Sequence, residues 1–187
     1  MKRHISIIAV ALMALVVVFG SCQKDPTPTP DPDPTPTYAK TQLSAKLYFS
    51  QDLIDFFDIT YTVNDFAGQE ISMDLTNEEA KLFETTEKNA SMKTVVTITL
   101  KEEYPEIDPE KEYTFQCTDA ATFGIINSDG NFDDVRTAKL TGIPSSTVMV
   151  SGEQMTPEHI QSLADVYAIG TKTVTFTVAD GKTITVE

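Results

Sequence analysis

A short acidic segment has the residue types and spacing of calcium ligands. Asp129, Asn131 and Asp133 occupy alternate positions, and alternate side chains of a tight loop can point at one hard cation. The rest of a calcium loop is missing, because Asp134 stands at the glycine position and Leu140 at the position of the closing acid. Asp, Asn and Gly also favour turns. We therefore expect a turn between two strands here, with a calcium site as the alternative and no other cofactor.

The remaining residues form no recognisable catalytic motif. His4 and His159 are the two histidines, too few for a zinc site or a Cys/His hydrolase. The sequence has no glycine-flanked nucleophilic serine, phosphate loop or dinucleotide fingerprint. A glycosidase needs two carboxylates at a set separation, which a sequence cannot establish. The candidate acids are Asp52, Asp55, Asp58, Glu102, Glu103, Asp108 and Glu110. We expect no catalytic site, and a carboxylate-based hydrolase is the enzyme alternative.

The chain has two cysteines, Cys22 and Cys117. Cys117 ends an alternating stretch in which it shares a face with Tyr113 and Phe115. This pattern predicts a small buried side chain, and a nucleophile or an intermolecular disulfide is the alternative.

Cys22 follows an apparent secretion signal. Lys2 and Arg3 precede an apolar run over residues 5–19, which is too short to span a bilayer but suits a signal sequence. Two small residues and Cys22 come next, with Phe19 where leucine is usual. The arrangement resembles the lipobox of bacterial lipoproteins. This resemblance implies cleavage before Cys22 and lipidation of its thiol, whereas an ordinary secretory signal or an uncleaved anchor helix is the alternative.

Lipidation at Cys22 would fix the protein to a membrane, because two or three acyl chains give nearly permanent anchoring. Gln23 follows the cysteine in place of the aspartate that marks inner-membrane retention in enteric bacteria. Residues 23–25 are similar to the charged export signals of Bacteroidota surface lipoproteins. We therefore expect an outer-membrane protein exposed at the cell surface, with its periplasmic face as the alternative.

A proline-rich spacer separates the anchor from the rest of the chain. Proline occupies every second position over residues 26–36, which favours an extended polyproline II conformation. The sequence thus divides into a signal peptide (1–21), a lipidated linker (22–37) and one domain (38–187). The formal charge of −14 becomes about −16 without residues 1–21, which carry Lys2 and Arg3 and no acid. So acidic a chain is not expected to bind nucleic acid.

Alternating apolar residues predict that the domain is mainly β. The same-face sets are Leu43, Ala45, Leu47 and Phe49; Phe57, Ile59, Tyr61 and Val63; Val96, Ile98 and Leu100; and Val174, Phe176 and Val178. Shorter strands are expected within 69–75, 122–126, 136–140 and 147–150. Asp180-Gly181 predicts a tight hairpin between strands 171–179 and 182–186.

Two helices are also expected. Thr156-Pro157-Glu158 supplies an N-cap, a proline at the first helical position and a first-turn acid. The apolar face of this helix would contain Ile160, Leu163, Ala164 and Tyr167. Thr76 and Glu79 match a capping box and predict a second helix over residues 77–85.

These elements predict a two-sheet sandwich of immunoglobulin-like or transthyretin-like topology, with a barrel as the alternative. The expected function is a noncatalytic surface module that binds a protein or glycan partner or serves as an accessory subunit. The alternative is a fimbrial or other self-assembling subunit that adds a strand to a neighbour's sheet. Aromatic residues that look available to a glycan are Tyr38, Tyr48, Phe66, Tyr104 and Phe132.

Overall fold

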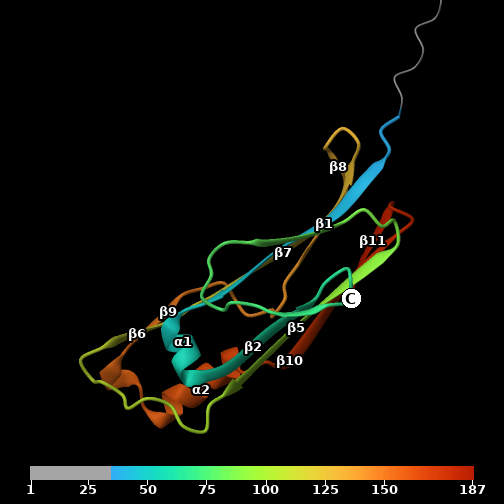
Figure 1. The fold of residues 1–187 in the computed structure, drawn as a ribbon. Coiled ribbons are helices and arrows are strands. Elements are labelled where there is room, and N and C mark those ends of the chain that lie inside the picture. The colour runs from blue at the N-terminus through green and yellow to red at the C-terminus, as the bar shows by residue number, and fades with distance from the viewer. Residues whose placement is uncertain (1–34) are drawn as a thin grey trace, which may run out of the picture. The chain divides into compact units, whose positions relative to one another are not determined.

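The alternating apolar residues build two antiparallel sheets that pack face to face (Figure 1). The computed structural model describes residues 35–187, so the expected signal, the linker up to residue 34 and Cys22 lie outside the described residues. Within residues 35–187 both large sheets end in edge strands, so they form a sandwich and not a closed barrel.

The first sheet, sheet A, has four strands and the second, sheet B, has five. In spatial order, sheet A contains β4 (Lys81–Thr85), β1 (Tyr38–Phe49), β7 (Cys117–Asn127) and β8 (Phe132–Ala138). Sheet B contains β11 (Thr183–Val186), β10 (Gly170–Ala179), β5 (Ala90–Leu100), β2 (Phe57–Asn64) and β3 (Glu70–Ser72). Each of the four shorter predicted strands overlaps a strand, and segment 122–126 lies within the longer β7.

A third, smaller sheet and the helices lie at one end of the sandwich (Figure 1). This sheet pairs β6 (Glu112–Phe115) with β9 (Val148–Ser151). Near it lie α1 (Gln51–Phe56), a 3₁₀ turn (Gly152–Gln154) and α2 (Pro157–Tyr167). The β7–β8 and β10–β11 hairpins lie at the opposite end, where β1 begins.

Most of the side chains that alternation predicted to face inward lie in the core, whereas Ile59 and Leu100 are only partly buried. Leu43, Phe49 and Val63 have no exposed surface, and Phe176 on β10 is equally buried. Phe176 packs against Phe123 of the opposite sheet with the ring centroids 5.4 Å apart. Burial of such side chains is worth about 1.5–3 kcal/mol each, and it holds the two sheets together.

The C-terminal hairpin and α2 form as predicted. Asp180 and Gly181 both have positive φ angles, which the tight β10–β11 turn requires. Thr156 caps α2 by accepting the backbone N–H of His159, and the four predicted apolar residues of the helix are buried. Local capping and turn chemistry therefore determine both elements.

The predicted helix over residues 77–85 is wrong. Residues 81–85 form β4, which pairs with β1, so that Phe83 is buried and Leu82 is exposed. Thr76 does not cap a helix, because its own N–H and hydroxyl donate to Asp74. The alternation of Leu82 and Phe83 suits a strand, and pairing with a strand distant in sequence decides the conformation.

A short helix, α1, was not predicted. It begins after Ser50 and buries Leu53 and Phe56. Ser50 provides no side-chain cap and instead donates its hydroxyl to the carbonyl oxygen of Thr114 on β6. Six residues give only one apolar pair at helical spacing, so the sequence contains little periodicity to detect.

Candidate functional site

Two hollows lie along one side of the sandwich, at the edge strands β4 and β3. We together call them the lateral groove. The inner hollow has a volume of about 230 Å³ and the outer one about 500 Å³. The inner hollow is lined by Ala45, Leu47, Tyr61, Ser72, Met73, Asp74, Asn77, Glu79 and Lys81. The outer hollow is lined by Asp65, Phe66, Ala67, Leu82, Phe83, Glu84, Thr85 and Glu87.

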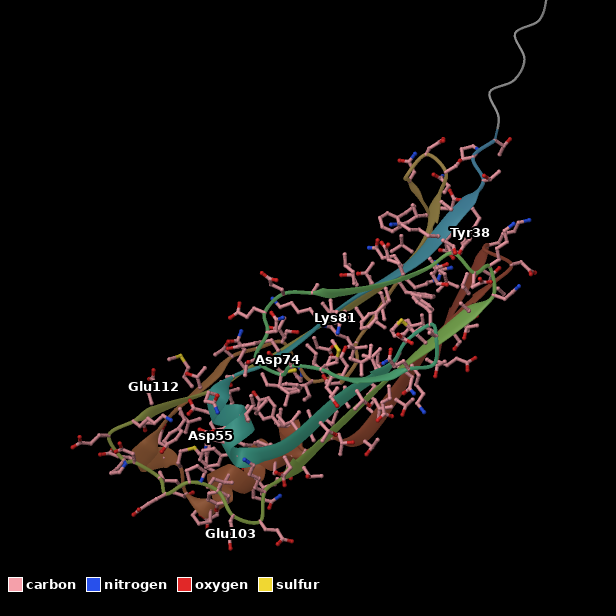
Figure 2. All side chains as sticks on the ribbon, viewed as in Figure 1. Tyr38, Asp55, Asp74, Lys81, Glu103 and Glu112 are labelled. Atoms are coloured by element: carbon pink, nitrogen blue, oxygen red, sulfur yellow. The ribbon has the colours of Figure 1, made fainter. Side chains whose placement is uncertain are left out.

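A mixture of charged and apolar groups from strands and from the loop between β3 and β4 surrounds the inner hollow. Leu47 projects inward from β1, and Lys81 of β4 contributes an amino group nearby. Asp74 and Lys81 both line this hollow and are labelled in Figure 2. Asp74 accepts the N–H and the hydroxyl of Thr76, and these hydrogen bonds, the backbone one first, hold the pKa of Asp74 below its ordinary value. The wall of this hollow therefore keeps a charged carboxylate at neutral pH.

Tyr61 reaches the inner hollow from β2 and has an unusual environment. Its side chain is buried, and its hydroxyl has no hydrogen-bond partner among the residues that the structure describes. Burial raises the pKa of Tyr61, with a smaller contribution from the negative charge of Asp119. The hydroxyl is consequently a neutral group at the base of the groove.

The outer hollow combines apolar rings with acidic residues. Phe83 is buried on β4, and Phe66 stacks on Phe123 with the ring centroids 6.1 Å apart. The charged residues lining this hollow are Asp65, Glu84 and Glu87, with no lysine, arginine or histidine among them. Leu82, unlike the buried Phe83 next to it on β4, is 57% exposed. The groove therefore offers an apolar floor with an acidic rim.

The predicted calcium ligands lie in and beside the β7–β8 turn. Asn127 organises this turn, because its Oδ1 accepts the N–H groups of Asp129 and Asn131 while its Nδ2 donates to Asp133 at 2.7 Å. Gly130 supplies the positive φ angle of the turn. One predicted ligand, Asp133, is thus already hydrogen-bonded within the turn. Calcium binding here stays a prediction.

Four of the seven candidate hydrolase acids fall into two groups, the first of which is Asp52 alone, while Asp55 accepts a hydrogen bond from Gln51 and Asp108 accepts the N–H of Glu110. Asp52 accepts the N–H of Thr114 and pairs with Lys111 at 2.5 Å, which raises the pKa of Lys111. Asp52 therefore connects α1 to β6. The second group, Asp58, Glu102 and Glu103, lines a hollow of about 610 Å³ near the helical end of the domain. The structure thus brings together three of the candidates, and a hydrolytic role for them stays an alternative.

Most of the aromatic rings that looked available to a glycan are engaged by the protein itself. Tyr104 stacks on Phe56 with the centroids 5.2 Å apart, and Phe66 stacks on Phe123. The ring of Phe132 lies over Gly124 and occupies the space that a Cβ atom there would need. The Tyr38 ring covers Gly181 in the same way. These contacts favour structural roles for all four rings.

Cys117 lies in the core, as its pattern predicted. The thiol has no exposed surface, and burial raises its pKa to about 12. The hydroxyl of Thr141, 4.0 Å away, opposes this rise, and Asp119 adds to it. A buried and protonated thiol is a poor nucleophile and is inaccessible to a second chain.

Asp119 is the polar residue that sequence reasoning missed. It is 1% exposed on β7, and its two carboxylate oxygens accept the N–H groups of Leu140, Thr141 and Gly142 and the hydroxyl of Thr141. A buried carboxylate is stable when hydrogen-bonded in this way. The alternation of β7 places Asp119 inward beside Ala121, but only the tertiary fold brings its partners to it.

Two features are absent from the described part of the chain. In residues 35–187 no helix has the length and apolar composition needed to cross a bilayer. Nor do three or more His, Cys, Asp or Glu side chains of these residues gather into a group able to hold a metal ion.

Comparison with protein-family models found no match to this chain, and comparison with curated proteins found no match either.

Proposed function

We propose that this chain is a lipid-anchored, noncatalytic module of the outer membrane, exposed at the cell surface, that binds a protein or glycan partner through the lateral groove. One observation supports the binding role: the two sheets leave a groove with an apolar floor and charged walls between β3 and β4. The anchoring role rests on the lipobox-like sequence that ends at Cys22.

The charge of the protein favours some partners over others. A mature chain of about −16 repels nucleic acid and anionic surfaces, and the rim of the outer hollow is itself acidic. A partner segment with basic residues would be attracted to this rim, and the attraction would weaken as the salt concentration rises.

Two alternatives remain from other classes of protein. A self-assembling surface subunit is favoured by the edge strands, which end both sheets without a further partner in residues 35–187. A hydrolase is favoured by Asp58, Glu102 and Glu103 around one hollow. Concentration-dependent oligomers of the purified protein would support the first, and polysaccharide turnover lost in Glu102→Gln would support the second.

The anchoring proposal is tested by exposing intact cells to protease. Digestion of the folded domain in wild-type cells, together with a diacylglyceryl mass on Cys22, is the expected result. Cys22→Ala should release the protein from the membrane fraction. Cys117→Ala is the matched control, because it removes a thiol from the core and should leave anchoring unchanged. An unmodified Cys22 would refute the anchor, and a domain protected on intact cells would refute surface display.

A further inference from the structure

The outer part of the lateral groove is bordered by an edge strand, β4, which has no further strand on its outer side among residues 35–187. β4 is the last strand of sheet A, and no strand of sheet B hydrogen-bonds to it within residues 35–187. The β3 edge that faces the same side has only three residues. On the other side of the sandwich, β8 and β11 pack against each other. β4 is therefore the longer of the two edge strands beside the groove.

The pairing of β1 shows which backbone groups of β4 face the groove. Ser50 donates its N–H to Gln116, so even-numbered residues of β1 direct their hydrogen bonds to β7 and odd-numbered ones to β4. Phe83 is opposite Leu43, an odd-numbered residue of β1, so the N–H and C=O groups of Phe83 point towards β1. Leu82 and Glu84 direct their N–H and C=O groups to the outer edge. These two residues provide the hydrogen-bonding positions for an added strand.

The side chains around this edge define the sequence that would fit it. An added strand would present alternate side chains to the core side, next to Phe83 and Phe66, and the others to the outer face, next to Leu82 and Glu84. The core side thus offers these two rings, and the ammonium group of Lys81 lies over the Phe83 ring, 5.5 Å from its centroid. The rim carries Glu84 and Glu87, of which Glu84 pairs with Lys40 and Glu87 has no ion pair among the described residues. An added segment should thus alternate apolar and basic residues.

We propose that the outer edge of β4 is the partner-binding surface of this protein and that it receives an extended segment of a partner protein in which apolar and basic residues alternate. The inference rests on the proposed binding function and adds the surface and the kind of partner. Main-chain hydrogen bonds to Leu82 and Glu84 provide the pairing. Apolar contact with Phe83 and charge attraction to Glu87 select the sequence.

The test uses the full lipidated chain in detergent micelles, labelled for amide NMR, with a heptapeptide of alternating lysine and valine as the probe. The expected result is saturable binding that slows hydrogen exchange at the amides of Leu82 and Glu84. A heptapeptide of alternating glutamate and valine should bind at least about tenfold more weakly. So should the lysine peptide with alternate amide nitrogens methylated, because it cannot complete the strand pairing.

Leu82→Pro is the decisive variant, because it removes an outward N–H and leaves the bonds between β4 and β1 in place. It should weaken peptide binding at least about tenfold. Leu82→Ala, which keeps the N–H, should weaken it less. Thr137→Pro is the matched control, since Thr137 lies at the corresponding outward position of the β8 edge and should leave binding unchanged. The thermal unfolding midpoint of each variant shows whether it is folded.

Several outcomes would overturn the proposal. They are no binding by the wild-type chain, exchange protection at β8 instead of β4, equal binding of the methylated peptide, and protection of Leu82 that depends on protein concentration without peptide. The last result would make a second copy of this chain the occupant. If the peptide fails while Cys22 is lipidated and the domain is displayed, the surface module stands and only the β4 assignment is lost.

Discussion

The two long sides of the sandwich are built differently. On one side, the edge strands β8 and β11 pack against each other, so the two sheets meet. On the other side, β4 and β3 are short, the chain crosses between them through residues 73–80, and two hollows remain. We call these the closed side and the open side.

Polar contacts show the same contrast. On the closed side, buried Asp119 holds the backbone of residues 140–142 just after β8. On the open side, Asp74 makes the corresponding kind of turn contact, with Thr76, in full exposure to solvent. Carboxylates thus order a loop on each side with protein donors, but only that of Asp119 is buried away from water. The closed side is therefore expected to carry the stability, which leaves the open side available for binding.

The largest effect on this comparison should come from Asp119→Ala. The substitution leaves buried N–H groups of the 140–142 loop without an acceptor, and we expect the free energy of unfolding to fall by about 4–5 kcal/mol. Urea denaturation measures this change. Asp74→Ala is the matched control on the open side and should lower stability by less than about 1 kcal/mol. Equal effects at the two positions would remove the distinction between the sides.

A second pair of variants compares the apolar packing of the two sides. Phe176 on β10 is fully buried next to the closed side, and Phe83 on β4 is 7% exposed and lines the groove. Phe176→Ala should cost about 4 kcal/mol, because it leaves a cavity in the core. Phe83→Ala should cost about 2 kcal/mol, since neighbours and water can fill the space beside the open groove. A larger loss at Phe83, measured by urea denaturation, would show that the groove is part of the core.

The closed side is also the part of the fold that the sequence predicts best. Phe176 and Val178 alternate with threonines, and Asp180-Gly181 has the local chemistry of a tight turn. These signals depend on a few neighbouring residues, so distant parts of the chain do not change them. The same applies to α2, whose cap at Thr156 and apolar spacing lie within one short segment.

The open side was predicted poorly, for a physical reason. The capping-box pattern of Thr76 and Glu79 is a local signal, but β4 forms because β1 lies beside it. The hollows depend on the order of strands in both sheets, which no local pattern specifies. Asp119 was missed for the same reason, because its partners follow it by more than twenty residues. A single inward acid in an otherwise apolar strand face is the only signal that the sequence contains.

The smallest effect concerns the buried thiol of Cys117, and it tests how dry the closed side is. Burial raises the pKa of this thiol from 9.0 to about 12, so the folded protein holds the proton to higher pH than the unfolded chain does. The contribution of this thiol to the free energy of unfolding is therefore fully present below pH 9. It falls as the pH rises above 9, by at most about 1.4 kcal/mol per pH unit. Urea denaturation at pH 8, 9, 10 and 11 measures this slope. Burial also raises the pKa values of Tyr61 and Tyr167, so only the difference between wild type and Cys117→Ala reports on the thiol. If the two proteins lose stability in parallel up to pH 11, water reaches Cys117 and the closed side is less dry than its packing implies.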